Sequence, residues 1–301
     1  MYEKGSLKTE GKTKRVYAVK GCPDVVIIEN KDDITKYDDP ALTRKMRSKA
    51  RIATDTACTV FEILQKAGIP VAYRGRVSDT EFVADKCQMI PLEIVVRRYA
   101  VGSFLLRFVC FARPDYEKEP YRFENLRSEA FLKTTGGWIV NAAGKEIGVL
   151  PIDPQTKRRI EDPFIVHHPE IGCWLLKHPK LPVDSADSNI LTISSEDILP
   201  EGASLQEMQR IAEQAFLILE AGFNRVDGLR LIDFKIEFGI GIKGQLFIAD
   251  VIDNDSWRLR TKDWQELSKE LFRQNKDMGI ILEAYEYVAY AAKRAAKALR
   301  E

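Results

Sequence analysis

Two carboxylates and a lysine alternate along residues 231–239, LIDFKIEFG. Asp233, Lys235 and Glu237 occupy every second position, and isoleucine and phenylalanine fill the positions between them. Because successive side chains of a β-strand point to opposite faces, this spacing predicts a strand with one polar and one apolar face. Carboxylate and ammonium groups on one face can bind a divalent cation and the phosphates of a nucleotide.

A second apolar run, residues 246–252, follows at a distance that predicts a β-hairpin. If Lys243-Gly244 is its two-residue turn, Glu237 lies directly opposite Asp250, with Cβ atoms about 4.5–5.5 Å apart. Carboxylates that close repel each other unless a cation lies between them, and Mg²⁺ usually takes one or two carboxylates together with nucleotide phosphates. An exposed hairpin face with solvated charges would show the same pattern, so both interpretations stay open.

The composition is that of an ordinary globular protein. The 301 residues carry a formal net charge of +1, which gives no reason to expect nucleic acid or a membrane as a partner. The five cysteines are scattered and lack CxxC spacing, and the first residues show no hydrophobic signal segment. We therefore expect a soluble cytoplasmic protein.

Residues 11–17, GKTKRVY, place two lysines beside a glycine at the start of an expected strand. The spacing does not fit a Walker A loop, which needs four residues between its first glycine and the GK pair. We expect a hairpin with residues 24–29, in which backbone N–H groups, Lys12 and Lys14 cover phosphates as glycine-rich loops do in kinases. A basic exposed strand is the other interpretation.

Residues 89–103, MIPLEIVVRRYAVGS, predict a buried strand that ends in two arginines and leads into a short helix over 104–108. We expect Ser103 to be the N-cap of that helix. Arg97 offers a bidentate group for carboxylate or phosphate, and a helix start attracts anions. The pattern indicates a phosphorylated or carboxylated substrate, although arginines at a strand end are often simply solvated.

The rest of the chain alternates between helical and extended patterns. Glycines and short apolar runs between 136 and 160 predict a β-ribbon excursion. The other expected elements are helices over 41–67, 204–221 and 278–299, and short strands around 71–77 and 81–84.

Taken together, these motifs resemble the SAICAR synthetases, the phosphoribosylaminoimidazole-succinocarboxamide synthases. The stretches that carry the resemblance appear in the family's order over nearly the whole chain. They are residues 11–17, 89–103, 231–239, 249–259 (ADVIDNDSWRL) and 273–289 (RQNKDMGIILEAYEYVA).

The resemblance implies an ATP-dependent ligase of de novo purine biosynthesis. Such an enzyme joins L-aspartate to the carboxylate of the aminoimidazole ribonucleotide CAIR, through an acyl phosphate, and gives SAICAR, ADP and phosphate. It implies Mg²⁺ with ATP as co-substrate and a monomer or homodimer. The implied fold is α+β, with a small antiparallel nucleotide-covering domain over 1–86 packed on a larger ATP-grasp-like domain over 87–301.

The resemblance also implies roles for individual residues. Glu237 and Asp250 match the Mg²⁺ ligands, and Lys235 matches the lysine that contacts the phosphates, so these three are the expected catalytic residues. The expected nucleotide-binding residues are Gly11, Lys12, Thr13, Lys14, Asp85, Lys86, Met89 and Lys235. The expected substrate-binding residues are Arg97, Ser103, Arg258, Lys133 and Asp162.

Three features depart from the commonest family pattern, and the smallest is Val101, where the family more often has Ala or Thr before Gly-Ser. The 136–160 excursion separates Lys133 from Asp162, which leaves those two assignments open. The stretch 250–257 resembles the version in bifunctional animal enzymes, although we expect this chain to be monofunctional. Two other classes stay in view: a kinase, because the Asp233-Lys235-Glu237 pattern followed by a further Asp is similar to a kinase catalytic loop, and a nucleotide-binding protein without catalysis.

Overall fold

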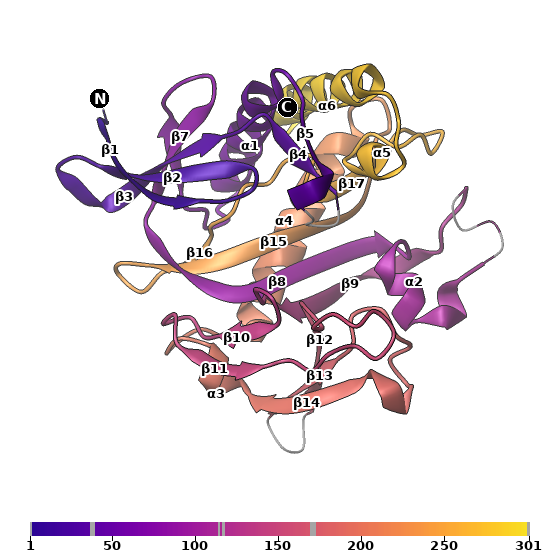
Figure 1. Ribbon diagram of the computed structural model, residues 1–301. Helices are drawn as coiled ribbons and strands as arrows, with labels where there is room; N and C mark the ends of the chain where they lie inside the picture. Colours follow the sequence, from indigo (N-terminus) through magenta and orange to yellow (C-terminus); the bar gives the residue numbers. More distant parts are fainter. Residues whose placement is uncertain (1, 37–39, 114, 116–117, 169–172, 300–301) are drawn as a thin grey trace. The chain divides into compact units, whose positions relative to one another are not determined.

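The computed structural model describes residues 2–36, 40–113, 115, 118–168 and 173–299, which fall into two compact units. The first unit comprises Met1–Cys87, Gln214–Phe234 and Gly241–Glu301, and the second comprises Gln88–Glu213 and Lys235–Ile240. This division groups C-terminal segments with the first 87 residues, whereas the family resemblance implies one domain over all of 87–301. Helices and antiparallel sheets occur in the same chain, which confirms the expected α+β class (Figure 1).

The first unit contains a five-stranded antiparallel sheet in the order β1-β2-β3-β7-β6. Its β2–β3 hairpin is the one that the sequence predicts, and Val25, Ile27 and Val83 form part of a buried core on this sheet. The strands are β1 (Lys4–Glu10), β2 (Lys14–Val19), β3 (Cys22–Asn30), β6 (Tyr73–Arg76) and β7 (Glu81–Asp85).

Helices α1 (Lys49–Lys66) and α6 (Met278–Ala298) pack side by side in this unit (Figure 1). Ile52, Val60 and Leu64 recur at helical spacing along α1 and are buried, so the apolar stripe of this helix is core.

The predicted start of the first helix at residue 41 is wrong. Residues 40–42 form a 3₁₀ turn, η1 (Pro40–Leu42), and β5 (Thr43–Lys45) pairs with β4 (Asp33–Thr35). The pairing with β4 satisfies backbone groups that a helix would otherwise have to satisfy, and this tertiary contact overrides the local helix propensity.

In the second unit the strands follow the order β14-β13-β12-β9-β8, and β8 is also the neighbour of β15 (Arg230–Gly241), which the two units share. Strands β8 and β9 are long antiparallel neighbours, paired Leu92 to Leu132 and Glu93 to Phe131 (Figure 1). The bounds are β8 (Cys87–Tyr99), β9 (Arg122–Leu132), β12 (Phe164–His168), β13 (Cys173–Lys177) and β14 (Asn189–Ser194). The predicted ribbon is also present, as β10 (Trp138–Val140) paired with β11 (Glu146–Val149).

Strand β15 (Arg230–Gly241) is the alternating strand that the sequence predicts. It contributes Lys235–Ile240 to the second unit and its other residues to the first. Asp233 and Glu237 are both buried, so the interpretation of this strand as an exposed, solvated face is wrong.

The turn after β15 differs from the predicted two-residue turn at Lys243-Gly244. The N–H of Gly241 donates to the carbonyl oxygen of Gln245 (2.8 Å), and the N–H of Gly244 donates to that of Gly241 (2.9 Å). The loop therefore has three residues and ends in a glycine with φ of 82°, the conformation that such loops require. The next strand, β16 (Leu246–Ile248), ends before Asp250, so the predicted pairing of Glu237 with Asp250 in the ladder is wrong.

The remaining elements are short, apart from one long helix. The predicted helices over 204–221 and 278–299 are confirmed to within three residues at each end. No helix in the described part of the chain is long and apolar enough to cross a membrane. The other elements are α2 (Ser103–Arg107), η2 (Val109–Phe111), η3 (Ala186–Ser188), α3 (Ser195–Ile198), α4 (Leu205–Asn224), β17 (Trp257–Arg260) and α5 (Glu270–Arg273).

Candidate active site

Charged groups of alternating sign gather around Glu237 in the second unit. The Nζ atom of Lys133 lies 2.5 Å from Oε1 and 2.6 Å from Oε2 of Glu237. The Nζ atom of Lys235 lies 3.8 Å from Oε1 of Glu237 and 2.5 Å from Oε1 of Glu93. The side chain of Glu237 is 7 % exposed, whereas those of Lys133 and Lys235 are 45 % and 41 % exposed. A ligand that arrives from solvent therefore meets ammonium groups first, which favours an anion.

Neighbouring strands position these four side chains. Lys235 and Glu237 are two residues apart on β15 and so share one face, and Glu93 is on the adjacent strand β8. Lys133 directly follows β9, and its N–H donates to the carbonyl oxygen of Pro91 (2.9 Å), which extends the pairing with β8 by one step. Sequence reasoning missed Glu93, whose only signal is a single acidic residue inside an apolar run.

Asp162 is held by the residue after Lys133. Its Oδ1 accepts a hydrogen bond from the N–H of Thr134 (2.8 Å), and its own N–H donates to Oγ1 of Thr134 (3.0 Å). The structure thus brings Lys133 and Asp162 into one neighbourhood despite the excursion between them. Burial raises the pKa of the Asp162 carboxyl above its ordinary value, against the opposing effects of the Thr134 N–H and the charge of Lys235.

Arg97 is buried in an ion cluster that the sequence did not reveal. Its Nε donates to Oε2 of Glu129 (2.5 Å), and Nη2 of Arg107 donates to Oε1 of the same carboxylate (2.6 Å). Arg107 also packs over the rings of Phe131 and Phe164. The simple picture of solvated arginines at the strand end is therefore wrong for Arg97.

Ser103 is the first residue of α2, and the N-cap is Gly102 with φ of 60°. The prediction of Ser103 as the N-cap is therefore wrong by one residue. The chain needs a left-handed conformation at this corner, which glycine adopts without steric cost.

In the first unit, Lys14 and Asp250 form an ion pair. The segment before Lys14 turns tightly, because the N–H of Gly11 donates to the carbonyl oxygen of Lys14 (2.9 Å). The carbonyl oxygen of Thr13 accepts from the N–H of Lys31 (2.7 Å), and Lys12 is exposed. These contacts fix the backbone of 11–14 next to β2 and leave a lysine amine beside a carboxylate.

Asp85 and Lys86, two of the expected nucleotide-binding residues, contact other residues of the first unit. The carboxylate of Asp85 accepts from Nε of Arg74 (3.0 Å), and the N–H of Lys86 donates to the carbonyl oxygen of Asp24 (2.9 Å). In the second unit, Met89 is 40 % exposed, as are other large apolar side chains of the chain.

Arg258, on β17, is held by two carboxylates. Its Nη1 donates to Oδ2 of Asp233 (2.6 Å), and its Nε lies 3.5 Å from Oε2 of Glu270. Burial alone would lower the pKa of Arg258, but the charges of Asp233, Glu270 and Glu266 raise it above the ordinary value. The guanidinium therefore stays charged in a partly buried place, as a group that grips an anion must.

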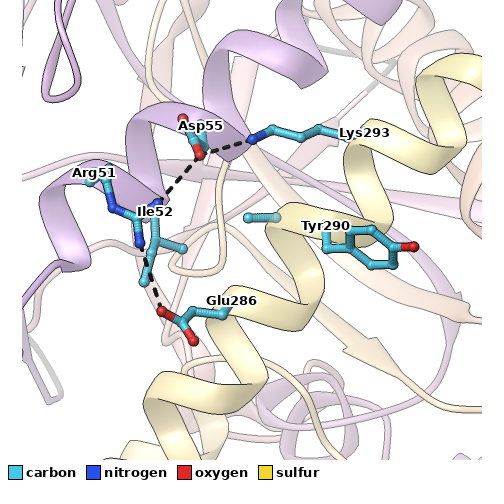
Figure 2. A pocket seen from close by; sticks show the side chains of 7 residues that line it. Arg51, Ile52, Asp55, Glu286, Tyr290 and Lys293 are labelled. Atoms are coloured by element: carbon cyan, nitrogen blue, oxygen red, sulfur yellow. Dashed lines mark hydrogen bonds and ion pairs between the residues drawn. The ribbon is translucent and has the colours of Figure 1, made fainter.

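A cavity of about 260 Å³ lies elsewhere in the first unit, between α1 and α6 (Figure 2). Its charged side chains pair with one another: Lys293 lies 3.0 Å from Asp55, and Arg51 lies 3.7 Å from Glu286. None of the residues singled out from the sequence lines it. We interpret this cavity as a gap in the packing between α1 and α6, across which ion pairs link the two helices.

Lysines beside a carboxylate can bind a phosphate-bearing ligand together with a divalent cation. The profile of the SAICAR synthetase family matches residues 7–138 and 184–289. The chain belongs to the SAICAR synthetase family.

Individual relatives agree with this assignment. The chain is 34 % identical over 276 residues to the "Probable multifunctional protein ADE2" of Caenorhabditis elegans, covering 90 % of this chain and 53 % of that protein. The chain thus spans about half the length of this relative and of the similar protein of Gallus gallus. It is 30 % identical to the phosphoribosylaminoimidazole-succinocarboxamide synthase of Chloroflexus aggregans, covering 97 % of this chain and 96 % of that protein.

Solved structures of SAICAR synthetases share the fold. The enzyme from Ehrlichia chaffeensis superposes with a TM-score of 0.67 at 23 % identity, covering 96 % of this chain and 98 % of that one. A type-2 SAICAR synthetase described in complex with ADP gives a TM-score of 0.66 at 23 % identity, covering 95 % and 97 %.

Proposed function

We propose that this chain is an ATP-dependent ligase that joins L-aspartate to the carboxylate of CAIR and gives SAICAR, ADP and phosphate. Membership of the SAICAR synthetase family supports the reaction. Complexes of structural relatives with ADP and, for the enzyme of Saccharomyces cerevisiae, with SAICAR support the two ligand classes. The proposed setting is de novo purine biosynthesis in the cytoplasm, with the chain acting as a monomer or homodimer.

The observation that carries the proposal is the cluster Glu93–Lys235–Glu237–Lys133. Phosphoryl transfer needs little covalent help from a protein, and it depends on positioning and on neutralising the charge of the transferred group. Here the side chains of Lys133 and Lys235 are partly exposed, and their amines lie beside the buried carboxylate of Glu237. Lys235 is the proposed phosphate contact, and its ion pair with Glu93 helps to hold the amine in place.

The oxygen donors present fit Mg²⁺. The described residues contain no group of three or more His, Cys, Asp or Glu side chains that would hold a metal ion alone. Mg²⁺ does not need one, because it usually takes one or two carboxylates plus substrate phosphates and water. Glu237 and Asp250 are the proposed ligands, and the bound ion would neutralise charge that develops on the phosphates. In this structure Glu237 pairs with Lys133, and Asp250 pairs with Lys14. When nucleotide binds, its phosphate oxygens can replace these carboxylates as the partners of the lysines.

The nucleotide is proposed to lie against residues 11–14, with its base near residues 85–89. The tight turn at Gly11 and the exposed Lys12 suit a cover over the phosphates. In domain terms, residues 1–86 would form this cover and residues 87–301 the body that holds substrate.

The chemistry runs in two steps that need no protein nucleophile. A carboxylate oxygen of CAIR bonds to the γ-phosphorus of ATP, and the bond from that phosphorus to the β–γ bridging oxygen breaks, releasing ADP. The amine nitrogen of L-aspartate then attacks the acyl carbon. The bond from that carbon to the phosphate oxygen breaks, phosphate leaves, and the new amide nitrogen loses its proton.

Cationic groups would hold the ribonucleotide. Arg258 and Arg97 are the proposed partners of its phosphate and carboxylate, because both are guanidinium groups that carboxylates hold in place. Ser103, Lys133 and Asp162 complete the proposed substrate contacts.

The direct test is ADP release, measured with CAIR and L-aspartate each present or omitted. The ligase should release ADP at its full rate only when both are present. A kinase would phosphorylate an acceptor without any need for L-aspartate, and a binding protein would show no turnover. ATP turnover that is indifferent to both substrates would refute the ligase.

A further inference from the structure

Residues 250–258, which we call the connecting segment, begin at Asp250 and end at Arg258. Asp255 within this segment belongs to a cluster of charged and polar side chains. Lys49, the first residue of α1, is 1 % exposed, and its Nζ lies 3.1 Å from Oδ2 of Asp255. The hydroxyl of Tyr285 on α6 donates to Oδ1 of Asp255 (2.9 Å), and Nζ of Lys269 lies 3.4 Å from Oδ2. Groups from separate parts of the first unit therefore meet at one carboxylate.

Hydrogen bonds within the connecting segment make it a single rigid turn. The hydroxyl of Ser256 donates to the carbonyl oxygen of Val251 (2.8 Å), and its N–H donates to that of Asp253 (2.9 Å). The N–H of Asp255 donates to Oδ1 of Asp253 (2.8 Å). Because these bonds link residues 251, 253, 255 and 256, we expect a displacement of Asp255 to be passed on to Asp250 and Arg258, which lie one and two residues beyond them.

The charges in this cluster depend on Lys49. Asp253 is buried and the nearby Asp255 side chain is 16 % exposed. Burial, followed by the charge of Asp255, raises the pKa of Asp253. Burial opposes the charged form of Asp255 as well, but Lys49 and then Lys269 lower its pKa well below the ordinary value. Without the cation of Lys49, a buried and a partly buried carboxylate would lie near each other with too little positive charge, and the segment would have to move or take up a proton.

The ends of the connecting segment carry the two groups that the proposed function uses. Asp250 forms an ion pair with Lys14, and Arg258 donates to Asp233. We propose that Lys49 is a positioning residue that, through Asp255, fixes the connecting segment and so holds Asp250 and Arg258 at a set separation. This role rests on the proposed function for what the two ends bind. Lys49 itself is buried, so we assign it no direct contact with a ligand.

The test uses Lys49→Met, which keeps much of the side-chain volume and removes the charge. Two quantities are measured. The KM for CAIR reports on Arg258, and the Mg²⁺ concentration for half-maximal activity reports on Asp250. Both should rise together by about 10- to 100-fold, the range for residues that orient a ligand-binding side chain. Lys66→Met, the same change at an exposed position of the same helix, should alter neither quantity. If Lys49→Met lowers only the melting temperature and leaves both quantities at the wild-type values, Lys49 is merely structural and the proposal is overturned.

A gentler variant covers the case in which Lys49→Met does not fold. Tyr285→Phe removes one hydrogen bond to Asp255 and keeps the ring. It should raise the same two quantities together by a smaller factor, and wild-type values for both would overturn the proposal.

Failure of the proposed function is distinguishable from failure of this inference. If the wild-type chain does not release ADP in response to CAIR and L-aspartate, the ligase assignment fails. The positioning role is then read from calorimetric binding of Mg²⁺–ADP, which Lys49→Met must weaken by about tenfold relative to Lys66→Met. Equal affinities in the two variants would reject the positioning role.

Discussion

The ammonium nitrogen of Lys133 lies 2.5 Å and 2.6 Å from the two carboxylate oxygens of Glu237, although 104 residues separate them in the chain. The contact places a solvent-accessible cation on an enclosed anion at the face where β8, β9 and β15 are neighbours. A bound nucleotide would compete for the amine, and the carboxylate would become available to the metal that accompanies it.

The first prediction concerns Glu237. The Glu237→Gln change preserves shape but removes the negative charge that a divalent cation needs, so kcat should fall by at least about 100-fold, as when one preorganised charge-stabilising group is lost. Glu146→Gln, the same change at an exposed position of β11, should leave kcat unchanged. Steady-state ADP release with both substrates measures the effect. Near-normal turnover in Glu237→Gln would show that the metal role is misassigned.

The second prediction concerns Asp250. In Asp250→Asn, turnover at ordinary Mg²⁺ should be lost while the far-UV circular dichroism spectrum stays that of the wild type, because the residue lies outside β16 and its backbone is not part of that strand. Asp263→Asn changes an exposed aspartate of the same unit and is the matched control. A titration of activity against Mg²⁺ separates the outcomes. If Asp250→Asn needs no more Mg²⁺ than the wild type, Asp250 is not a ligand.

The third prediction is a pH-dependent gain in stability from Asp162→Asn. Asp162 has φ of 47°, which asparagine tolerates well, and an amide oxygen can still accept from the N–H of Thr134. Because burial raises the pKa of Asp162, its charged form destabilises the native state at pH values above that pKa, and the penalty disappears as the pH falls and the carboxyl binds a proton. The variant should therefore melt at a higher temperature than the wild type at about pH 8, and the difference should shrink towards about pH 4, near the ordinary pKa of aspartate.

Melting curves for both proteins across this range are the measurement. A difference that grows as the pH falls would have the wrong sign for this account. Since Asp162 is also a proposed substrate contact, we expect the stabilised variant to be less active, and the two readouts are independent.

The fourth prediction concerns the buried cluster of Arg97, Arg107 and Glu129. Glu129→Gln leaves two buried guanidinium groups without their carboxylate, so the free energy of unfolding should fall by about 3–5 kcal/mol, the usual cost of removing one partner from a buried ion pair. Glu124→Gln on the same strand is exposed and should cost little. Urea unfolding of both variants gives the comparison, and equal midpoints would mean that the cluster contributes nothing to stability.

Local patterns predicted much of the fold. The β2–β3 hairpin, the 136–160 ribbon and the two long C-terminal helices follow from alternation, turn residues and helical spacing, which are local properties. The start of α1 did not follow, because β5 pairs with β4 and that contact is decided by tertiary structure. The hairpin register also failed, since a three-residue loop ending in glycine shifts every facing pair by one.

The candidate site was predictable in its residue types but not in its partners. Lys235 and Glu237 stood out by their spacing, whereas Glu93 is a single acid in an apolar run whose partner lies 142 residues away. Lys49 gave no signal at all, because a lysine at a helix start is usually solvated, and only packing shows that it is buried beside Asp255. Long-range pairs of this kind depend on which strands and helices become neighbours.

The most direct measurement of the central claim follows an oxygen atom. CAIR labelled with ¹⁸O in its carboxylate is turned over with ATP and L-aspartate, and the released phosphate is analysed by mass spectrometry. If the carboxylate is phosphorylated and then attacked by the amine, the bond from the acyl carbon to oxygen breaks and the phosphate carries one ¹⁸O atom. Phosphate without the label would contradict the account, because the carboxylate would not have been activated.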